Sequence, residues 1–242
     1  MKYIIEIATS DFTTTKSAVE GGAHRIELCA NLAEGGTTPS YGTIKKCREA
    51  FEISLYPIIR PRGGDFLYTD EEFSIMLQEI KLCKQLGCDG IVTGVLQKDG
   101  TIDVKKISLL VAAAYPLGVT FHRAFDRCKE PFIALEQLIE TGCERILTSG
   151  QQPSVVDGVE LVAELQRKAD ERIIIMPGSG VRKENIKMLS QKTGCVEFHS
   201  SLRGKKPGKM EFLHPSFKNS EESYSNNAID VEEVKFLIDA LN

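Results

Sequence analysis

The fold is decided by two strand-like runs, Tyr3-Ile-Ile-Glu-Ile-Ala8 and Arg25-Ile-Glu-Leu-Cys29. A helical segment that begins near Asp11 lies between them. Each run sets one glutamate among apolar residues, and Cys195-Val-Glu-Phe-His199 repeats the pattern. An extended chain turns alternate side chains to opposite faces, so each glutamate points away from the apolar face. Burying a carboxylate costs several kcal/mol unless it is paired or hydrogen-bonded. The repetition therefore predicts a polar interior and a functional site.

Strand-like runs and helical patterns alternate along the whole chain. The apolar runs predict strands near 3–8, 24–29, 54–59, 89–93, 117–122, 144–148, 171–176 and 195–199. Helices are expected to begin near Asp11, Pro39, Asp70, Asp103, Pro131, Pro153 and Arg182, and a last helix covers 229–241. Eight such units in 242 residues predict a single-domain (β/α)8 TIM barrel over 1–242. An open doubly wound sheet is the alternative.

Composition restricts the class of partner. The chain carries 30 Lys plus Arg against 34 Asp plus Glu, a net charge of -4, and no basic run, so nucleic acid is not expected as a partner. No apolar stretch approaches the roughly twenty residues of a membrane span. The seven cysteines form no CxxC pair, which argues against a structural zinc site and suits a reducing compartment. We expect a soluble, cytoplasmic protein.

In a TIM barrel the active site lies at the carboxyl ends of the strands. Taking the inward-facing residues of each expected strand gives Glu6, Glu27 with Cys29, Arg60, Thr93, Thr120 with His122, Thr148, and Glu197 with His199. The first, second and eighth strands are neighbours in a closed barrel, so the three glutamates are expected side by side. Arg60 and His122 are the cations expected to offset them. This set predicts catalytic roles for Glu6, Glu27, His122 and Glu197; a satisfied ion network that plugs the barrel is the alternative.

Loops at the same face suggest anion binding. Arg60-Pro-Arg-Gly-Gly-Asp-Phe66 offers two guanidinium groups, those of Arg60 and Arg62, beside flexible backbone. Met176-Pro-Gly-Ser-Gly180 and His199-Ser-Ser201 follow the seventh and eighth strands, where this fold often holds phosphate. The predicted anion-binding residues are Arg60, Arg62, Arg123, Gly178, Gly180 and Ser200.

The chain resembles the CutC copper homeostasis family along nearly its whole length. The matching stretches are Arg25-Ile-Glu-Leu-Cys29, Glu34-Gly-Gly-Thr-Thr-Pro-Ser40, Pro57-Ile-Ile-Arg-Pro-Arg-Gly-Gly-Asp65, Thr120-Phe-His-Arg-Ala-Phe-Asp126, Arg145-Ile-Leu-Thr-Ser-Gly150 and Glu197-Phe-His-Ser-Ser201. The resemblance implies a (β/α)8 barrel, a cytoplasmic location, a homodimer or larger homo-oligomer, and a role in copper handling with copper ion binding. It implies no established enzymatic reaction.

One position departs from the family pattern. Members often carry Cys two residues after the first-strand glutamate, where this chain has Ala8. Cys29 remains, and with His122 or His199 it forms the predicted metal set, because copper(I) prefers soft ligands. A small buried hydrophobic residue is the alternative for Cys29.

Three classes of function stay open. The first is a copper-binding homeostasis factor, and the second is a barrel enzyme that acts on a small anionic or phosphorylated metabolite. In the enzyme, Glu27 or Glu6 serves as general base, His122 as acid or electrophile, and Arg60 with Arg62 as anion clamps. The third is an interaction protein without chemistry. The segment at about 202–228 lacks periodicity, and we expect it to cover the barrel mouth as a lid or to form a subunit contact.

Overall fold

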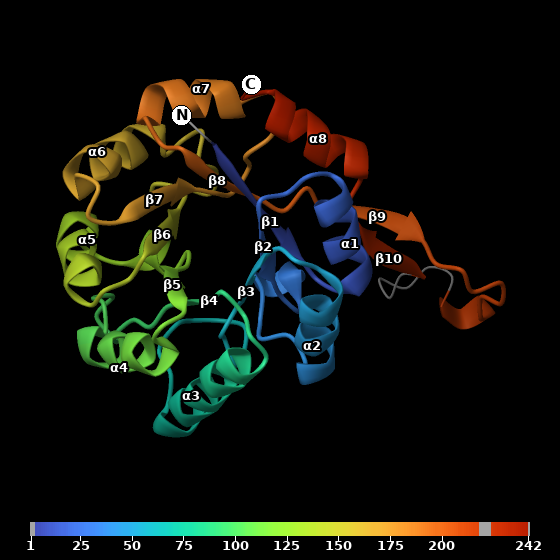
Figure 1. Ribbon diagram of the computed structural model, residues 1–242, viewed down its shortest axis with the longest axis horizontal. Coiled ribbons are helices and arrows are strands. Elements are labelled where there is room, and N and C mark those ends of the chain that lie inside the picture. The colour runs from blue at the N-terminus through green and yellow to red at the C-terminus, as the bar shows by residue number, and fades with distance from the viewer. Residues whose placement is uncertain (1–2, 218–223, 242) are drawn as a thin grey trace.

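The protein folds as a ring of eight strands surrounded by eight α-helices (Figure 1). The computed structural model describes residues 3–217 and 224–241. The ring strands are β1 (Ile4–Thr9), β2 (Arg25–Leu28), β3 (Ser54–Pro57), β4 (Gly90–Thr93), β5 (Gly118–Phe121), β6 (Arg145–Thr148), β7 (Ile174–Pro177) and β8 (Glu197–Ser200). The helices are α1 (Phe12–Glu20), α2 (Tyr41–Ala50), α3 (Asp70–Gln85), α4 (Val104–Ala114), α5 (Pro131–Glu140), α6 (Val159–Ala169), α7 (Ile186–Thr193) and α8 (Val231–Asp239).

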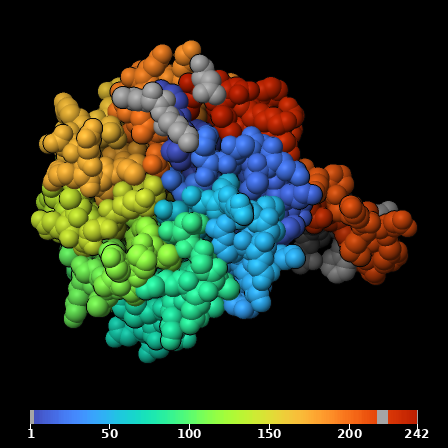
Figure 2. All heavy atoms as spheres, in the orientation of Figure 1, coloured from blue at the N-terminus to red at the C-terminus, as the bar shows by residue number. Residues whose placement is uncertain are grey.

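All strand pairs within the ring are parallel. Hydrogen-bonded ladders join the strands into two sheets of four, in the orders β3-β2-β1-β8 and β4-β5-β6-β7. A parallel bridge between Ile58 and Val92 connects the β3 and β4 sides, and β7 lies beside β8 at the other seam, where no ladder is found among the described residues. The predicted TIM-barrel fold is confirmed, and atoms cover the centre of the ring on the face that Figure 2 shows.

Local sequence signals fix several helix starts. Thr69 caps α3 in a capping box with Glu72, and Pro131 occupies the first turn of α5. The helix expected near Pro153 begins at Val159 instead. Gln151 adopts a positive φ of 59° and donates its backbone N–H to Asp126, so a folded loop precedes the helix.

The helix expected near Arg182 also starts later, at Ile186. The side chain of Asn185 accepts a hydrogen bond from the backbone N–H of Arg182 and donates one to the carbonyl of Gly180. These two bonds hold a turn ahead of α7. The loop after β7 is therefore longer than the sequence pattern predicts, and it extends over the carboxyl end of the ring.

The segment after β8 forms a projecting hairpin. Strands β9 (Gly204–Pro207) and β10 (Ser225–Ala228) pair antiparallel and lie beside α1, on the outside of the ring (Figure 1). The segment at 202–228, expected as a lid or a subunit contact, thus borders the main cavity at Arg203, and from Gly204 on its described strands extend away from the ring. Residues 218–223 lie outside the described residues.

Candidate functional site

A layer of buried ion pairs crosses the inside of the barrel. Strand register places Glu6 of β1 beside Arg25 of β2 on one side and beside His199 of β8 on the other. Arg25 donates from Nε to Glu6 Oε2 at 2.5 Å and from Nη2 to Glu197 Oε2 at 2.6 Å, and Arg145 Nε donates to the same Glu197 oxygen at 2.7 Å. The two arginines are at most 5% exposed, so these pairs are shielded from water.

The arginines compensate two of the three strand glutamates. Burial alone raises the pKa of Glu6, but attraction to Arg25 and the hydrogen bond from His199 outweigh burial and bring it to about 2. Neither Glu6 nor Glu197 borders the main cavity of the barrel. Both residues belong to a satisfied ion network inside the barrel, which was the alternative to a catalytic role. The two predicted catalytic residues therefore lie beneath the cavity floor.

The compensating cations differ from those expected. We expected Arg60 and His122, but the ion pairs come from Arg25 and Arg145 at the beginnings of β2 and β6. Arg25 shares the inward face of β2 with Glu27, two residues later, so period two could have identified it. In β6 the inward residues are Arg145 and Leu147, whereas Thr148, expected inside, donates to Asp126.

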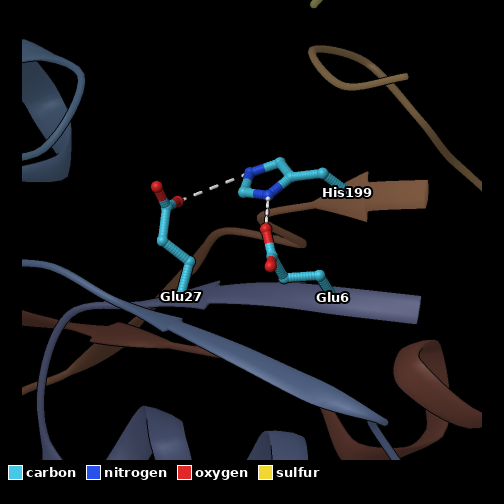
Figure 3. A group of neighbouring side chains, drawn as sticks. All are labelled: Glu6, Glu27 and His199. Carbon is cyan, nitrogen blue, oxygen red and sulfur yellow. Dashed lines mark hydrogen bonds and ion pairs between the residues drawn. The ribbon is translucent and has the colours of Figure 1, made fainter. Parts of the chain in front are cut away.

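His199 lies between two glutamates (Figure 3). Its Nδ1 is 2.8 Å from Glu6 Oε1, and its Nε2 is 3.7 Å from Glu27 Oε2. Because Glu6 is ionised, Nδ1 carries the proton and donates to it. Burial lowers the pKa of His199, but the Glu6 hydrogen bond and the charges of Glu27 and Glu6 outweigh burial and leave it raised. When His199 is protonated, its second N–H faces Glu27.

Glu27 is the glutamate that titrates near neutrality. It is 5% exposed and borders the cavity. Burial, helped by the negative charge of Glu6, raises the pKa of Glu27 to about 7 against the opposing effect of His199. A carboxylate in this state suits a general base, because base strength and the ionised fraction are both adequate near pH 7.

His122 faces the same cavity in the opposite electrostatic state. Burial and the nearby charge of Arg60 lower the pKa of His122 to about 3, so the ring is neutral. The backbone N–H of Ala124 donates to His122 Nδ1 at 3.1 Å, which assigns the ring proton to Nε2. Nε2 is buried and has no hydrogen-bond partner among the described residues. A buried donor of this kind is available to donate to an oxygen atom that enters the cavity.

The cavity above these groups has a volume of about 1040 Å³. Its wall includes Glu27, His122 and His199, together with apolar side chains from the loops after β2, β3 and β4, among them Leu32, Phe66 and Leu96. This volume is at the upper end of the range typical of small-molecule sites.

The predicted anion-binding arginines are largely occupied. Arg60 borders the cavity, but its guanidinium donates to the carbonyls of Glu34, Gly36 and Gly64, and only Nε remains without a partner in the described chain. Arg62 pairs with Glu72 and Asp65 and does not border the cavity. Arg123 borders it while paired with Asp126.

Of the predicted anion-binding residues Gly178, Gly180 and Ser200, one borders the main cavity. Gly180 borders the cavity, whereas Gly178 and Ser200 do not. A Cβ at Gly178 would lie 2.4 Å from a Leu147 methyl group, so close packing requires this glycine. Ser200 Oγ donates to the carbonyl of Val181 and accepts from Arg182, so it orients an arginine.

The predicted metal set is not assembled. Among the described residues, the potential metal-ligating atoms that lie within 4.8 Å of one another belong to Glu6, Glu27 and His199, a group without Cys29 or His122. The two carboxylates face opposite nitrogens of the His199 ring (Figure 3). Burial and Glu27 raise the pKa of the Cys29 thiol well above its usual range.

Four positively charged residues that border the cavity were not predicted as site residues from the sequence. Lys98, Arg127, Arg182 and Arg203 all border the main cavity, and none forms an ion pair with a carboxylate in the described part of the chain. They lie in loops whose course over the barrel is not encoded in a local pattern. The fold and the cavity together define a TIM-barrel protein with a cavity that Glu27, His122 and several arginine and lysine side chains border.

Comparison with known proteins gives the family. The CutC family model matches residues 3–204, and the chain belongs to the CutC family. The family protein CutC of Parabacteroides distasonis is 56% identical over 213 residues, which cover 88% of each chain. The Chromobacterium violaceum relative is 44% identical over 100% of this chain and 99% of its own.

Solved structures agree with the fold. CutC of Streptococcus agalactiae, described in connection with copper homeostasis, has a TM-score of 0.79 at 35% identity, covering 82% of this chain and 98% of that one. N-(5'-phosphoribosyl)anthranilate isomerase of Pyrococcus furiosus has a TM-score of 0.58 at 11% identity over 99% and 98% of the two chains, which shows a shared fold alone. No helix in the described chain is both long and apolar enough to cross a membrane.

Proposed function

We propose that this protein is an enzyme that moves a proton on a small anionic carbonyl compound. One observation carries the proposal: Glu27, with a pKa of about 7, and neutral His122, with an unpartnered Nε2–H, border one cavity. The pKa of Glu27 is raised, the pKa of His122 is lowered, and both side chains border the same cavity. Opposite pKa shifts in one site are typical of an acid–base pair.

The chemistry follows from the protonation states. Ionised Glu27 accepts a proton from the carbon next to a substrate carbonyl, while His122 Nε2–H donates a hydrogen bond to the carbonyl oxygen as negative charge develops there. On a substrate with a hydroxyl group on that carbon, His122 Nε2 gives its proton to the former carbonyl oxygen and takes one from the neighbouring hydroxyl group, while Glu27 returns its proton to the former carbonyl carbon, which completes an isomerisation. His199, held by Glu6, lowers the pKa of Glu27 and so favours its ionised form.

The proposal can be tested before the substrate is identified. A metabolite pool from a cell extract is incubated with the protein in D2O, and mass spectrometry records which species gain carbon-bound deuterium. We expect exchange with the parent protein and none with Glu27→Gln. Glu79→Gln is the matched control, since burial also raises the pKa of Glu79 but this residue lies outside the cavity wall. A pool that gains no deuterium, or equal exchange by Glu27→Gln, contradicts the proposal.

Copper binding is the second candidate, and Cys29 favours it. The thiol lies directly after β2, two residues from Glu27, to which it donates a hydrogen bond. Copper(I) prefers sulfur ligands, but the raised pKa of Cys29 means that binding must displace a proton. We therefore propose weak copper affinity, and we place the protein in the cytoplasm because its seven cysteines are all free thiols.

A further inference from the structure

We propose that Arg182 and Arg203 bind a phosphate group, and that the substrate is a phosphomonoester. This inference rests on the proposed function, since it names the anionic part of the same substrate. Both arginines border the main cavity and also a smaller adjoining cavity of about 340 Å³. They therefore lie at the boundary of the two spaces, where a group can contact both side chains.

The two guanidinium groups are positioned without being neutralised. Arg182 Nη1 donates to the carbonyl of Val181 at 2.9 Å and to Ser200 Oγ at 3.1 Å. Arg203 Nη1 donates to the carbonyl of Leu32 at 2.8 Å, which fixes the start of the hairpin against the loop after β2. These neutral acceptors hold each side chain in place and leave its positive charge available. A planar guanidinium donates paired hydrogen bonds well suited to phosphate oxygens.

The nearby carboxylates are already engaged. Asp230 and Glu233 border the smaller cavity, as does Lys205. Asp230 accepts from the backbone N–H of Glu232 at the start of α8, and Glu233 pairs with Lys183 at 2.9 Å. Two arginines and a lysine thus face a space with two carboxylates, of which Glu233 is paired with Lys183, a cation outside that lining. This excess of positive charge fits a dianion better than a single carboxylate.

The place in the barrel is consistent with the proposed reaction. Arg182 follows β7 and Arg203 follows β8, whereas His122 follows β5, two strands from β7, and Glu27 belongs to β2, two strands from β8. A ligand with its phosphate at the arginines can therefore extend its carbon chain into the main cavity, which His122 and Glu27 border. The arrangement predicts a carbonyl separated from the phosphate by a short carbon chain.

The test uses glycerol 3-phosphate, which has no carbonyl and cannot be turned over. Isothermal titration calorimetry should show binding that glycerol lacks and that inorganic phosphate reproduces more weakly. Arg182→Ala and Arg203→Ala should each weaken binding about tenfold or more, as expected for a charged hydrogen bond. The affinity of the corresponding lysine variants for glycerol 3-phosphate should lie between that of the parent and that of the alanine variants. Arg172→Ala is the control, because Arg172 is paired with Glu136 on the outside of the ring.

Glu27→Gln separates this inference from the proposed function. The variant should bind glycerol 3-phosphate as the parent does while losing deuterium exchange. Phosphate binding that depends on both arginines, without exchange by any metabolite, would sustain the phosphate site and remove the proton-transfer function. Exchange confined to unphosphorylated metabolites, or titrations that neither arginine variant changes, would overturn the phosphate site.

Discussion

Replacing Gly94 with alanine is expected to displace His122 and to slow proton transfer. A Cβ at this position would lie 2.5 Å from Cε1 and Nδ1 of His122 and 3.0 Å from the Cβ of Ala124. An ordinary contact needs at least 3.4 Å, so the imidazole must move by about 1 Å. Misplacing a catalytic group by about 1 Å costs about 100-fold in rate.

The same displacement has a stability cost that can be measured independently. Overpacking a buried site costs about 1–3 kcal/mol. For a chain of this length each kcal/mol lowers Tm by about 2–4 °C, so the expected fall is roughly 2–12 °C. Gly42→Ala is the matched control, because a Cβ there meets no atom within 4 Å and the site lies within α2. This control should stabilise the helix by up to about 1 kcal/mol.

Three readouts decide the outcome for Gly94→Ala. Calorimetry gives Tm, nitrogen NMR of the histidine rings gives the position and tautomer of His122, and deuterium exchange gives the rate. Glycerol 3-phosphate affinity should stay at the parent value, since Gly94 is remote from Arg182 and Arg203 in the strand order. A folded variant whose ring signals shift while exchange keeps the parent rate would refute the assigned role of His122, and parent-like ring signals would refute the predicted displacement.

Three further predictions concern Glu27, Cys29 and the hairpin. Exchange should rise as pH increases through about 7, because Glu27 acts in its ionised form. The folded pKa of Glu27 lies above the ordinary value of 4.5, so its charged form destabilises the fold and stability should fall from about pH 4.5 to about pH 7; Glu27→Gln should flatten that part of a pH–Tm profile. In a competition titration, Cys29→Ser should lower Cu(I) affinity more than any other single cysteine substitution, and equal affinity would place the copper site elsewhere. Deleting 204–228 and joining its ends should alter the oligomeric state or ligand binding while leaving Tm nearly unchanged, as light scattering, calorimetry and titration would show; a deletion that changes neither assembly nor binding would contradict a role for the hairpin.

The sequence by itself determined the architecture. Strand-length apolar runs that alternate with helical segments specify parallel strands covered by helices, and period two placed Glu6, Glu27 and Glu197 inside the ring. The same local reasoning found caps such as Thr69. These features are readable because each depends on residues close together in the chain.

Only the tertiary structure decided which glutamate can act. Parallel register sets Glu6 beside Arg25 and His199, residues 19 and 193 positions away, and leaves Glu27 without a comparable cation pair. The pKa of Glu6 and that of Glu27 therefore shift in opposite directions, although their sequence contexts look alike. Charge pairing, burial and loop course arise from contacts between distant segments, and no local pattern encodes which segments will meet.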